Sequence, residues 1–481
     1  MMLRLLMILL LASVSPTPCT DAGEIIGFKA GPQTGTDVVL SHVARKALVA
    51  EFLDPDDTGM GKSISYLVWR EILTAISDQA GAGVILARAP GNERITDMLE
   101  QAYHEAAIGL AKGQEAGMAV WGAVNAAGDD LSVSTYLSLL PETADSQLTL
   151  GLFGQPPLAP GLQAEITRTN YNFPPVETTR AQLFDRRIVT RAAVTLRATA
   201  DPSAKAVAKV SKNTALDAVD MDKGWFKVRL ANGTFAYLDN SVVDVPPGTI
   251  EAAHVPITLK AAPAGQAVRK VTLNGTYRVL DMRYVAKTGL WYELAVGDAR
   301  GWVPAHLVRA RFSLPIVHFV AGLYRYQFKR YEDARREFAQ YVSAPNSAAD
   351  NPSLAAAYQL LGAGTLLTKG TVFEADPSTM DYFSSAVKAT PYDPAAYSLR
   401  ALSALAVQKE AGRALKDLEQ ALTLDPTDPI PPKIIDALRT ELKKPHSTMK
   451  YLLRDGQNPA VLQQLDDIAT RYPIADVPTP Q

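Results

Sequence analysis

The feature that most constrains the fold of this chain is an internal repeat in its middle third. Alternating apolar and polar segments occur twice in the same order. Three positions recur at offsets of 63, 66 and 65 residues, namely Leu196 and Leu259, Trp225 and Trp291, and Tyr237 and Trp302. Several short alternating strands separated by turns are typical of a small β-barrel. The repeat therefore predicts two such barrels, at residues 186–247 and 250–312.

Particular segments of this repeat resemble a known family. They are Val-Thr-Leu-Arg at 194–197, Gly-Trp-Phe-Lys-Val at 224–228 and Gly-Trp-Val-Pro-Ala-His-Leu-Val at 301–308. Both copies are similar to bacterial SH3 domains, although the first has Ala236-Tyr237 where Gly-Trp is usual. The resemblance implies contact with peptidoglycan peptides or with an envelope protein.

SH3-like barrels offer grooves for peptides, and aromatic side chains are the candidate ligand contacts. We select Trp302 and Tyr292 first, followed by Tyr237. Trp302 is expected at an exposed groove, whereas Trp225 and Trp291, at matching positions, are expected in the barrel cores.

From residue 314 the apolar pattern has helical spacing. Small residues recur where paired helices would touch, and Pro391 and Pro426 are 35 residues apart, against about 34 in a tetratricopeptide repeat. Residues 314–427 resemble such repeats and predict an α-solenoid. Residues 428–481 are expected to form about two capping helices and a tail. The resemblance implies a partner surface, on which we place Tyr324 and Tyr358.

Residues 37–155 alternate strand and helix patterns, which predicts a layered α/β domain. The helix ending in Gly-Ala-Gly-Val and the strand Ala-Gly-Met-Ala-Val-Trp-Gly resemble the N-terminal domain of TolB and related domains of curli and flagellar outer-membrane assembly proteins. That resemblance implies an envelope assembly module and not a catalyst. Residues 156–185 are rich in Pro, Asn and Thr and are expected to form a linker, with one strand near 162–169. The predicted class is a multidomain α+β chain.

The N-terminus has the pattern of a secretory signal peptide. Arg4 precedes an almost wholly apolar run from Leu5 to Ala12, and small residues precede a cleavage point after Ala22. We therefore assign 1–22 as a signal peptide and expect a periplasmic protein. A short uncleaved anchor is the alternative.

Composition excludes several kinds of chemistry. The formal net charge of −2 argues against a protein that coats nucleic acid. Cys19 is the single cysteine and would be lost with the signal peptide, which excludes disulfides and cysteine-based metal sites. We expect no cofactor and no metal.

Two stretches suggest catalysis but lack essential parts. Gly59 to Ser63 resembles a phosphate loop, yet Asp56 stands where the first glycine is needed and Asp54 and Asp57 flank it. We therefore expect no nucleotide. His104-Glu105 resembles part of a zinc-protease helix without its second histidine, so His104 is expected on a helix surface.

Charge differs between the modules. Residues 37–155 carry 16 acidic and 7 basic side chains, whereas 186–312 carry 10 acidic and 19 basic. The modules could dock on each other, the barrels could face an anionic polymer, or the charges could simply be solvated.

The sequence therefore favours a non-enzymatic envelope scaffold or adaptor. It would bind a peptide, protein or cell-wall ligand through its barrels and a second protein through its helical repeats. One alternative is a periplasmic assembly or secretion accessory protein without glycan binding. The other is a hydrolase whose catalytic site lies in 37–155.

Overall fold

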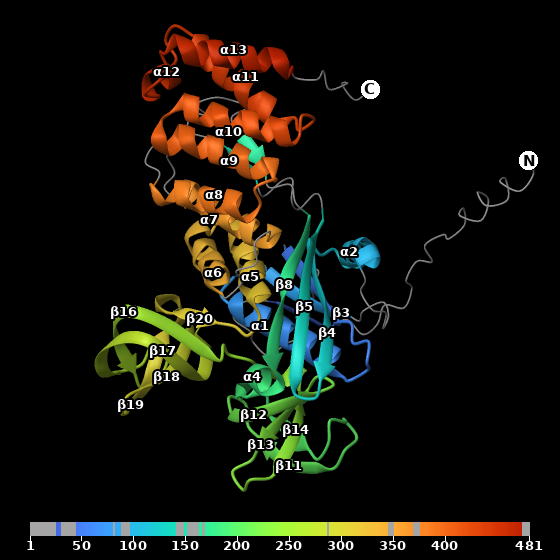
Figure 1. The fold of residues 1–481 in the computed structure, drawn as a ribbon. Coiled ribbons are helices and arrows are strands. Elements are labelled where there is room, and N and C mark those ends of the chain that lie inside the picture. Colours follow the sequence, from blue (N-terminus) through green and yellow to red (C-terminus); the bar gives the residue numbers. More distant parts are fainter. Residues whose placement is uncertain are drawn as a thin grey trace, which may run out of the picture.

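The computed structural model describes residues 26–29, 45–79, 82–87, 97–140, 149–151, 163–165, 169–285, 288–344, 351–368 and 376–473. The predicted signal peptide and the end of the predicted tail lie outside these residues. The described chain combines three larger β-sheets with a helical C-terminal region, so it is a mixed α+β structure (Figure 1).

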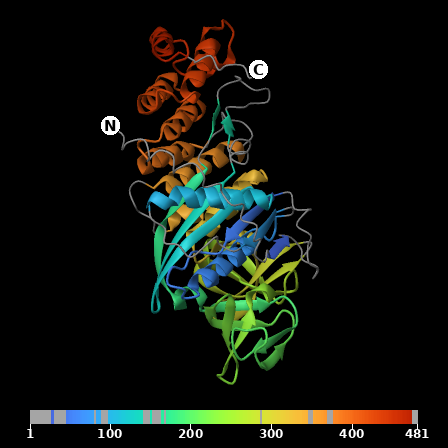
Figure 2. The ribbon, with the colours of Figure 1, turned by 90° about the vertical axis from the view of Figure 1, so that its right-hand side faces the viewer.

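The first unit is a six-stranded sheet in the order β1-β3-β2-β4-β5-β8. β2 runs parallel to β3 and β4, and the remaining pairs are antiparallel. The helices α1 and α2 cover it; α2 crosses the sheet in Figure 2. The bounds are β1 Ile26–Lys29, β2 Arg45–Ala50, α1 Met60–Ala75, β3 Ala82–Ala87, α2 Asp97–Gly113, β4 Met118–Ala127, β5 Asp130–Leu139 and β8 Asn170–Thr179.

The linker expected at 156–185 is wrong for its second half. Residues from Asn170 to Thr179 form β8, which pairs along β5, and α4 (Arg180–Phe184) follows directly. The side chains of Tyr171 and Phe173, at alternate positions of this strand, are buried. Proline is tolerated at sheet edges and bulges, and β8 is an edge strand whose register shifts between Phe173 and Val176. The paired prolines therefore mark an edge strand.

Residues 149–165 contribute a small hairpin. β6 (Thr149–Gly151) pairs with β7 (Gln163–Glu165). β7 lies against α9 and α11 of the helical region. This part of the chain thus connects the sheet to the C-terminal helices.

The first barrel is a sheet in the order β11-β10-β14-β13-β12-β9-β15. The repeated segments at 194–197 and 224–228 correspond to β10 and β13. The strands of this barrel are β9 Arg186–Thr190, β10 Val194–Arg197, β11 Ala206–Val210, β12 Ala215–Asp222, β13 Trp225–Arg229, β14 Phe235–Asp239 and β15 Val243–Asp244, with the short helix η2 at Asn240–Val242.

The second repeat makes the same pairings with fewer, longer strands. Its strands are β16 Thr249–Lys260, β17 Ala267–Val285, β18 Gly289–Val296, β19 Ala299–Pro304 and β20 Arg309–Arg311, with η3 at Ala305–Leu307. The pair Arg197 and Tyr237 of the first barrel corresponds to Lys260 and Trp302 of the second. β16 pairs with β17 along both of its halves and with β19 and β20, which closes the sheet on itself.

Two backbone positions allow the long strands to bend. His254 in β16 has φ 52° beside a register shift, and Gly275 in β17 has φ 126°. Left-handed backbone of this kind favours glycine and marks bulges and bends. The two halves of each bent strand therefore occupy the places of two separate strands in the first barrel.

From α5 onward the chain is helical, and each helix from α5 to α10 packs on the next. The helices are α5 Pro315–Gln327, α6 Tyr331–Ser343, α7 Pro352–Thr368, α8 Ser378–Ala389, α9 Pro394–Ser403, η5 Ala404–Gln408, α10 Ala411–Leu424, α11 Ile430–Lys443, α12 Thr448–Leu452 and α13 Pro459–Arg471. None of the helices in the described ranges is long and apolar enough to cross a membrane.

Glycines allow two of these helix pairs to approach closely. A Cβ on Gly322 would lie 2.7 Å from the ring of Phe338, and one on Gly362 would lie 2.7 Å from Phe383. Both distances are shorter than an ordinary van der Waals contact, so neither position has room for a larger side chain. The small residues noted in the sequence therefore do stand where helices touch.

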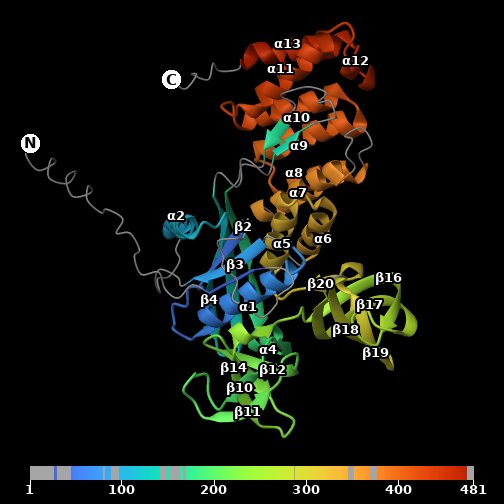
Figure 3. The same ribbon diagram turned by 180° about the vertical axis from the view of Figure 1, so that it is seen from behind.

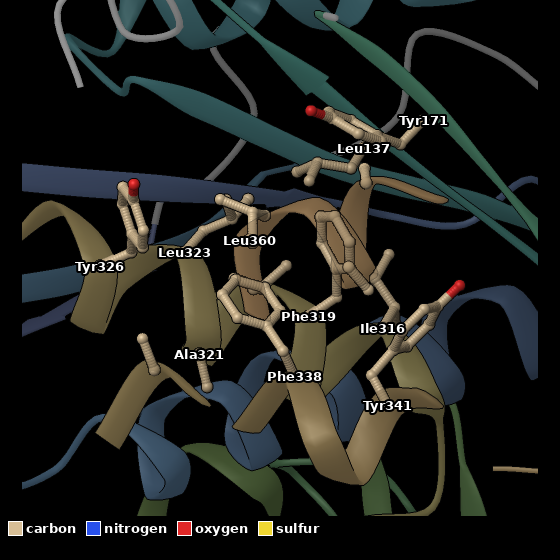
Figure 4. Close-up of a cluster of buried hydrophobic side chains, with 14 of the residues drawn as sticks. Leu137, Tyr171, Ile316, Phe319, Ala321, Leu323, Tyr326, Phe338, Tyr341 and Leu360 are labelled. Atoms are coloured by element: carbon tan, nitrogen blue, oxygen red, sulfur yellow. The ribbon is translucent and has the colours of Figure 1, made fainter. Parts of the chain in front are cut away.

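The helical region is anchored on the sheet through aromatic packing. Phe319 of α5 lies 5.2 Å from the rings of both Tyr171 and Phe173 of β8 and 5.6 Å from Phe338 (Figure 4). The sheet, the first barrel and the helices share one continuous hydrophobic core. The second barrel has a core of its own.

Glu71 of helix α1 forms a buried ion pair with Arg186 of β9 and a hydrogen bond with Ser313, just before α5. The Arg186 guanidinium donates to Glu71 Oε1 at 2.5 Å, and Ser313 donates to the same oxygen through its hydroxyl. Glu71 is fully buried and Arg186 is 5% exposed. Arg70 and Thr74 of α1 donate to the carbonyls of Asn240 and Val245. The first barrel and the start of α5 are therefore fixed to one helix.

We expect Glu71→Ala to destabilise the protein by about 3–5 kcal/mol, because it leaves the Arg186 charge buried and unpaired. Asp298→Ala is the control, since its pair with Arg269 is exposed on both sides, at 85% and 51%, and should contribute at most about 1 kcal/mol. Thermal unfolding followed by circular dichroism compares the two variants. Equal melting temperatures would contradict the role given to Glu71.

Candidate functional site

The structure places the predicted ligand aromatics in different environments. Trp302 and Tyr292 are only 4% and 3% exposed, so the expectation that Trp302 is exposed is wrong. Tyr237 is half-buried, as is Trp225, which was expected in the core. Trp302 and Tyr237 occupy equivalent positions but differ in what covers them.

Neighbouring side chains explain the burial of Trp302. The guanidinium carbon of Arg283 lies 4.9 Å from the centre of the Trp302 ring, within the range of a cation–π contact. Lys260 is its cross-strand partner on β16, and Glu293 is its partner on β18. The Trp302 indole is therefore inaccessible although it is on the outer face of the barrel, because neighbouring side chains cover it.

The two aromatics proposed for the helical region also have structural contacts. Tyr324 is fully buried and donates to the carbonyl of Gly83 in β3 at 2.5 Å. Burial raises the pKa of Tyr324 above its usual range. This tyrosine fastens α5 to the sheet and is not on a partner surface. Tyr358 is half-buried and packs against the small cluster of Ala355, Ala386 and Ala389.

A groove on the second barrel is a candidate binding surface. We call it the β16–β19 groove. Its volume is about 610 Å³, and it is lined by Pro256, Ile257, Thr258, Lys260, Lys270, Val271, Thr272, Trp291, Pro304 and Leu307.

The lining combines an apolar floor with positive charge. Trp291 lies opposite Pro304, and Thr258 lies opposite Lys270, on neighbouring strand pairs. Leu307 is 41% exposed at the rim. Lys260 and Lys270 bring two positive charges, and the lining includes no acidic residue. Such a surface suits an extended ligand with apolar groups and carboxylates.

The sequence placed Trp291 in the barrel core; the side chain is buried as expected, but it lies outside the inner core cluster and at the groove. Its side chain is 6% exposed, yet it lines the groove, and its Nε1 donates to Thr288 Oγ1 at 2.9 Å. Successive strand residues point to opposite faces. Tyr292 belongs to the inner core of the barrel, so that alternation could have placed Trp291 on the outer face.

The stretch from Gly59 to Ser63 is a helix start held by the chain's own acid. The Asp54 carboxylate accepts from the backbone N–H of Thr58 at 3.1 Å and of Gly61 at 3.2 Å. The N–H groups that a phosphate would use in a phosphate loop are thus partly occupied by Asp54. This geometry gives no support to nucleotide binding.

His104 is buried and not on the helix surface as expected. Its Nδ1 lies 2.7 Å from Ser138 Oγ and its Nε2 lies 3.0 Å from Asn172 Oδ1. Trp121 Nε1 donates to the same serine oxygen at 3.1 Å. The serine is fully buried, so the cluster fastens α2 to the sheet. Within the described ranges, no group of three or more His, Cys, Asp or Glu side chains could hold a metal ion.

Comparison with protein families identifies one segment. Residues 192–244 match the family described as bacterial SH3 domain. This match confirms the first of the two SH3-like barrels predicted from the repeat. It covers only a small part of the chain.

No curated protein matches this chain at the level of significance applied. Among solved structures, NlpC2 from Trichomonas vaginalis is 12% identical, with 27% of this chain and 49% of that chain covered and a TM-score of 0.15. NlpC1 from the same organism is 13% identical, with 28% and 48% covered and a TM-score of 0.15. The chain thus spans about half the length of these two structures.

A PelC variant, a dodecamer from Paraburkholderia phytofirmans, is 16% identical, with 24% of this chain and 70% of that chain covered and a TM-score of 0.13.

We expect Trp302→Ala to destabilise the second barrel by about 3–5 kcal/mol, because it removes a large buried side chain. Tyr237→Ala, at the half-buried equivalent position, should cost clearly less. Calorimetric melting of both variants makes the comparison. A Trp302→Ala protein that melts like the wild type would show that this indole does not support the fold.

Proposed function

We propose that this chain is a non-enzymatic scaffold or adaptor of a bacterial envelope. Its barrels bind a cell-wall peptide, with the β16–β19 groove as the ligand site, and its helical region binds a second protein. The observation that carries the proposal is the match of residues 192–244 to the bacterial SH3 family, because that family resemblance implies contact with peptidoglycan peptides.

The second barrel is proposed to be a further SH3-like domain. Its strand pairings reproduce those of the first barrel, including the bridge between Lys260 and Trp302 that corresponds to Arg197 and Tyr237. A short 3-10 helix precedes the last strand in both, at η2 and η3. Equivalent topology in two adjacent repeats supports a common fold for both.

The groove chemistry fits a cell-wall peptide. Such peptides combine short apolar side chains with free carboxylates. Pro304 and the exposed Leu307 supply apolar surface, and Lys260 and Lys270 supply positive charge. The net positive charge of 186–312 would help to attract an anionic polymer.

The helical region is proposed to be a tetratricopeptide-like solenoid that recruits a protein. The close contacts of Gly322 with Phe338 and of Gly362 with Phe383 support this, since small residues against aromatics are what the repeat pattern predicts. Helical repeats present extended surfaces for partner segments. The TolB-like character of 37–155 and the signal peptide at 1–22 remain predictions that fit a periplasmic location.

The proposal is tested by co-sedimentation of the full chain, lacking only 1–22, with purified peptidoglycan. We expect pelleting of the wild type and a several-fold loss for Lys270→Gln. The matched control is Lys209→Gln, the same position in the first barrel, which should retain pelleting. Both lysines are exposed, so neither variant should affect folding.

A second variant and a salt series separate specific binding from charge attraction. Leu307→Ser removes an exposed apolar contact at the rim without changing charge, and we expect it to weaken pelleting as well. The series runs from about 0.05 to 1 M salt, across which the Debye length falls to about 3 Å. Absence of pelleting, or equal losses for Lys270→Gln and Lys209→Gln, would contradict a site in the β16–β19 groove.

A further inference from the structure

A second cavity lies where the second barrel meets the rest of the molecule. We call it the junction cleft; its volume is about 150 Å³. β20 passes beside α6 at this point (Figure 3). The barrel contributes Tyr292, His306 and Arg309, the turn after α1 contributes Asp78, and α5 and α6 contribute Arg325 and Arg336.

One buried donor that lines this cleft lacks a hydrogen-bond acceptor among the described residues, namely Arg325 Nε. Arg325 is 9% exposed, and its Nε makes no hydrogen bond, although Glu337 Oε1 lies 3.5 Å away. Its Nη2 donates to the carbonyl of Ala75 at 2.7 Å. Tyr292 is 3% exposed and also lines the cleft, and its hydroxyl is not one of the buried atoms without a partner. An unpaired buried donor costs about 1–3 kcal/mol, so an acceptor in the cleft would be stabilising.

The hydroxyl of Tyr292 is not required for barrel packing. The equivalent residue of the first barrel is Phe226, 66 positions earlier, which is fully buried. Both rings lie in the core of their barrels. The second barrel therefore carries a hydroxyl at a position where the first barrel has only a phenyl ring. This hydroxyl belongs to a side chain that lines the junction cleft.

The acids that face the cleft already have partners. Asp78 accepts from Arg325 and Arg330, and Asp333 accepts from Arg330 and Arg336. Glu337 lies 2.8 Å from Nδ1 of His318. Burial alone would raise the pKa of Asp78, but Arg325 and Arg330 hold it below its usual value. The spare hydrogen-bonding capacity thus lies with the donor Arg325 Nε.

The charges around Tyr292 keep its hydroxyl protonated. Burial raises the pKa of Tyr292 well above its ordinary value, and Glu337 and Asp78 raise it further, whereas Arg325 opposes them. At neutral pH the hydroxyl is therefore a donor. Arg309 and His306 are exposed and line the cleft, and Arg309 adds positive charge there.

We propose that the junction cleft binds a small carboxylate, with the Tyr292 hydroxyl and Arg325 Nε as its donors. A cleft of about 150 Å³ suits a small ligand such as an amino acid or the carboxyl end of a peptide. This site is additional to the proposed function. Trp291 and Tyr292 are adjacent in β18 and line different cavities.

Isothermal titration calorimetry of the full chain lacking 1–22 tests the site, with sodium acetate, alanine and methylammonium chloride as probes in a carboxylate-free buffer. We expect acetate and alanine to bind and methylammonium not to bind. Tyr292→Phe should weaken acetate binding about tenfold, as expected for loss of a hydrogen bond to a charged group. It should fold normally, because the first barrel has Phe226 at this position.

Tyr326→Phe is the matched control. Tyr326 is also 3% exposed, and its hydroxyl is unpartnered among the described residues, but it does not line the cleft, and its loss should leave acetate binding unchanged. The proposal is overturned if neither acetate nor alanine binds at millimolar concentration, if methylammonium binds equally well, or if phosphate binds in preference to acetate. Equal affinities of Tyr292→Phe and the wild type would also overturn it. Peptidoglycan pelleting depends on Lys270 and not on Tyr292, so the two proposals fail separately.

Discussion

The architecture depends on one buried carboxylate in helix α1. Glu71 is fully buried and accepts from Arg186, at the start of the first barrel, and from Ser313, just before α5. These partners are 115 and 242 residues away along the chain. Burying a charge is costly unless a partner of opposite charge is placed with good geometry. The pair therefore restricts how sheet, barrel and helices can be joined.

Helix α1 carries further contacts that act in the same direction. Arg70 and Thr74 donate to carbonyls of the first barrel, and Arg325 donates to the carbonyl of Ala75 at the end of the helix. Arg325 thereby supplies a positive group near the last carbonyls, where the helix dipole is negative. Helix α1 thus makes hydrogen bonds with both the first barrel and the helical region.

The two barrels share their strand pairings but differ in attachment. The first barrel merges its core with that of the sheet and the helices, whereas the second keeps a separate core. The second barrel meets the remaining modules partly across the polar junction cleft and an exposed pair between Arg278 and Asp185. Its outer face, with the exposed Lys270 and Leu307, is left to solvent at the β16–β19 groove. Of the two, the second barrel therefore has the more independent surface.

Local pattern by itself indicated several strands of each repeat, the correspondence between the repeats and a helical region from residue 314, because alternation and helical spacing are short-range properties. Only the tertiary structure decided what covers each side chain. Trp302 faces outward as its strand predicts, yet Arg283 covers it. The prolines of β8 made its sequence look like a linker. Its place as an edge strand depends on pairing with β5, which is distant in sequence. Tyr292 matches Phe226 in the repeat, and only the packing of α1, α5 and α6 against the second barrel places it at a cleft.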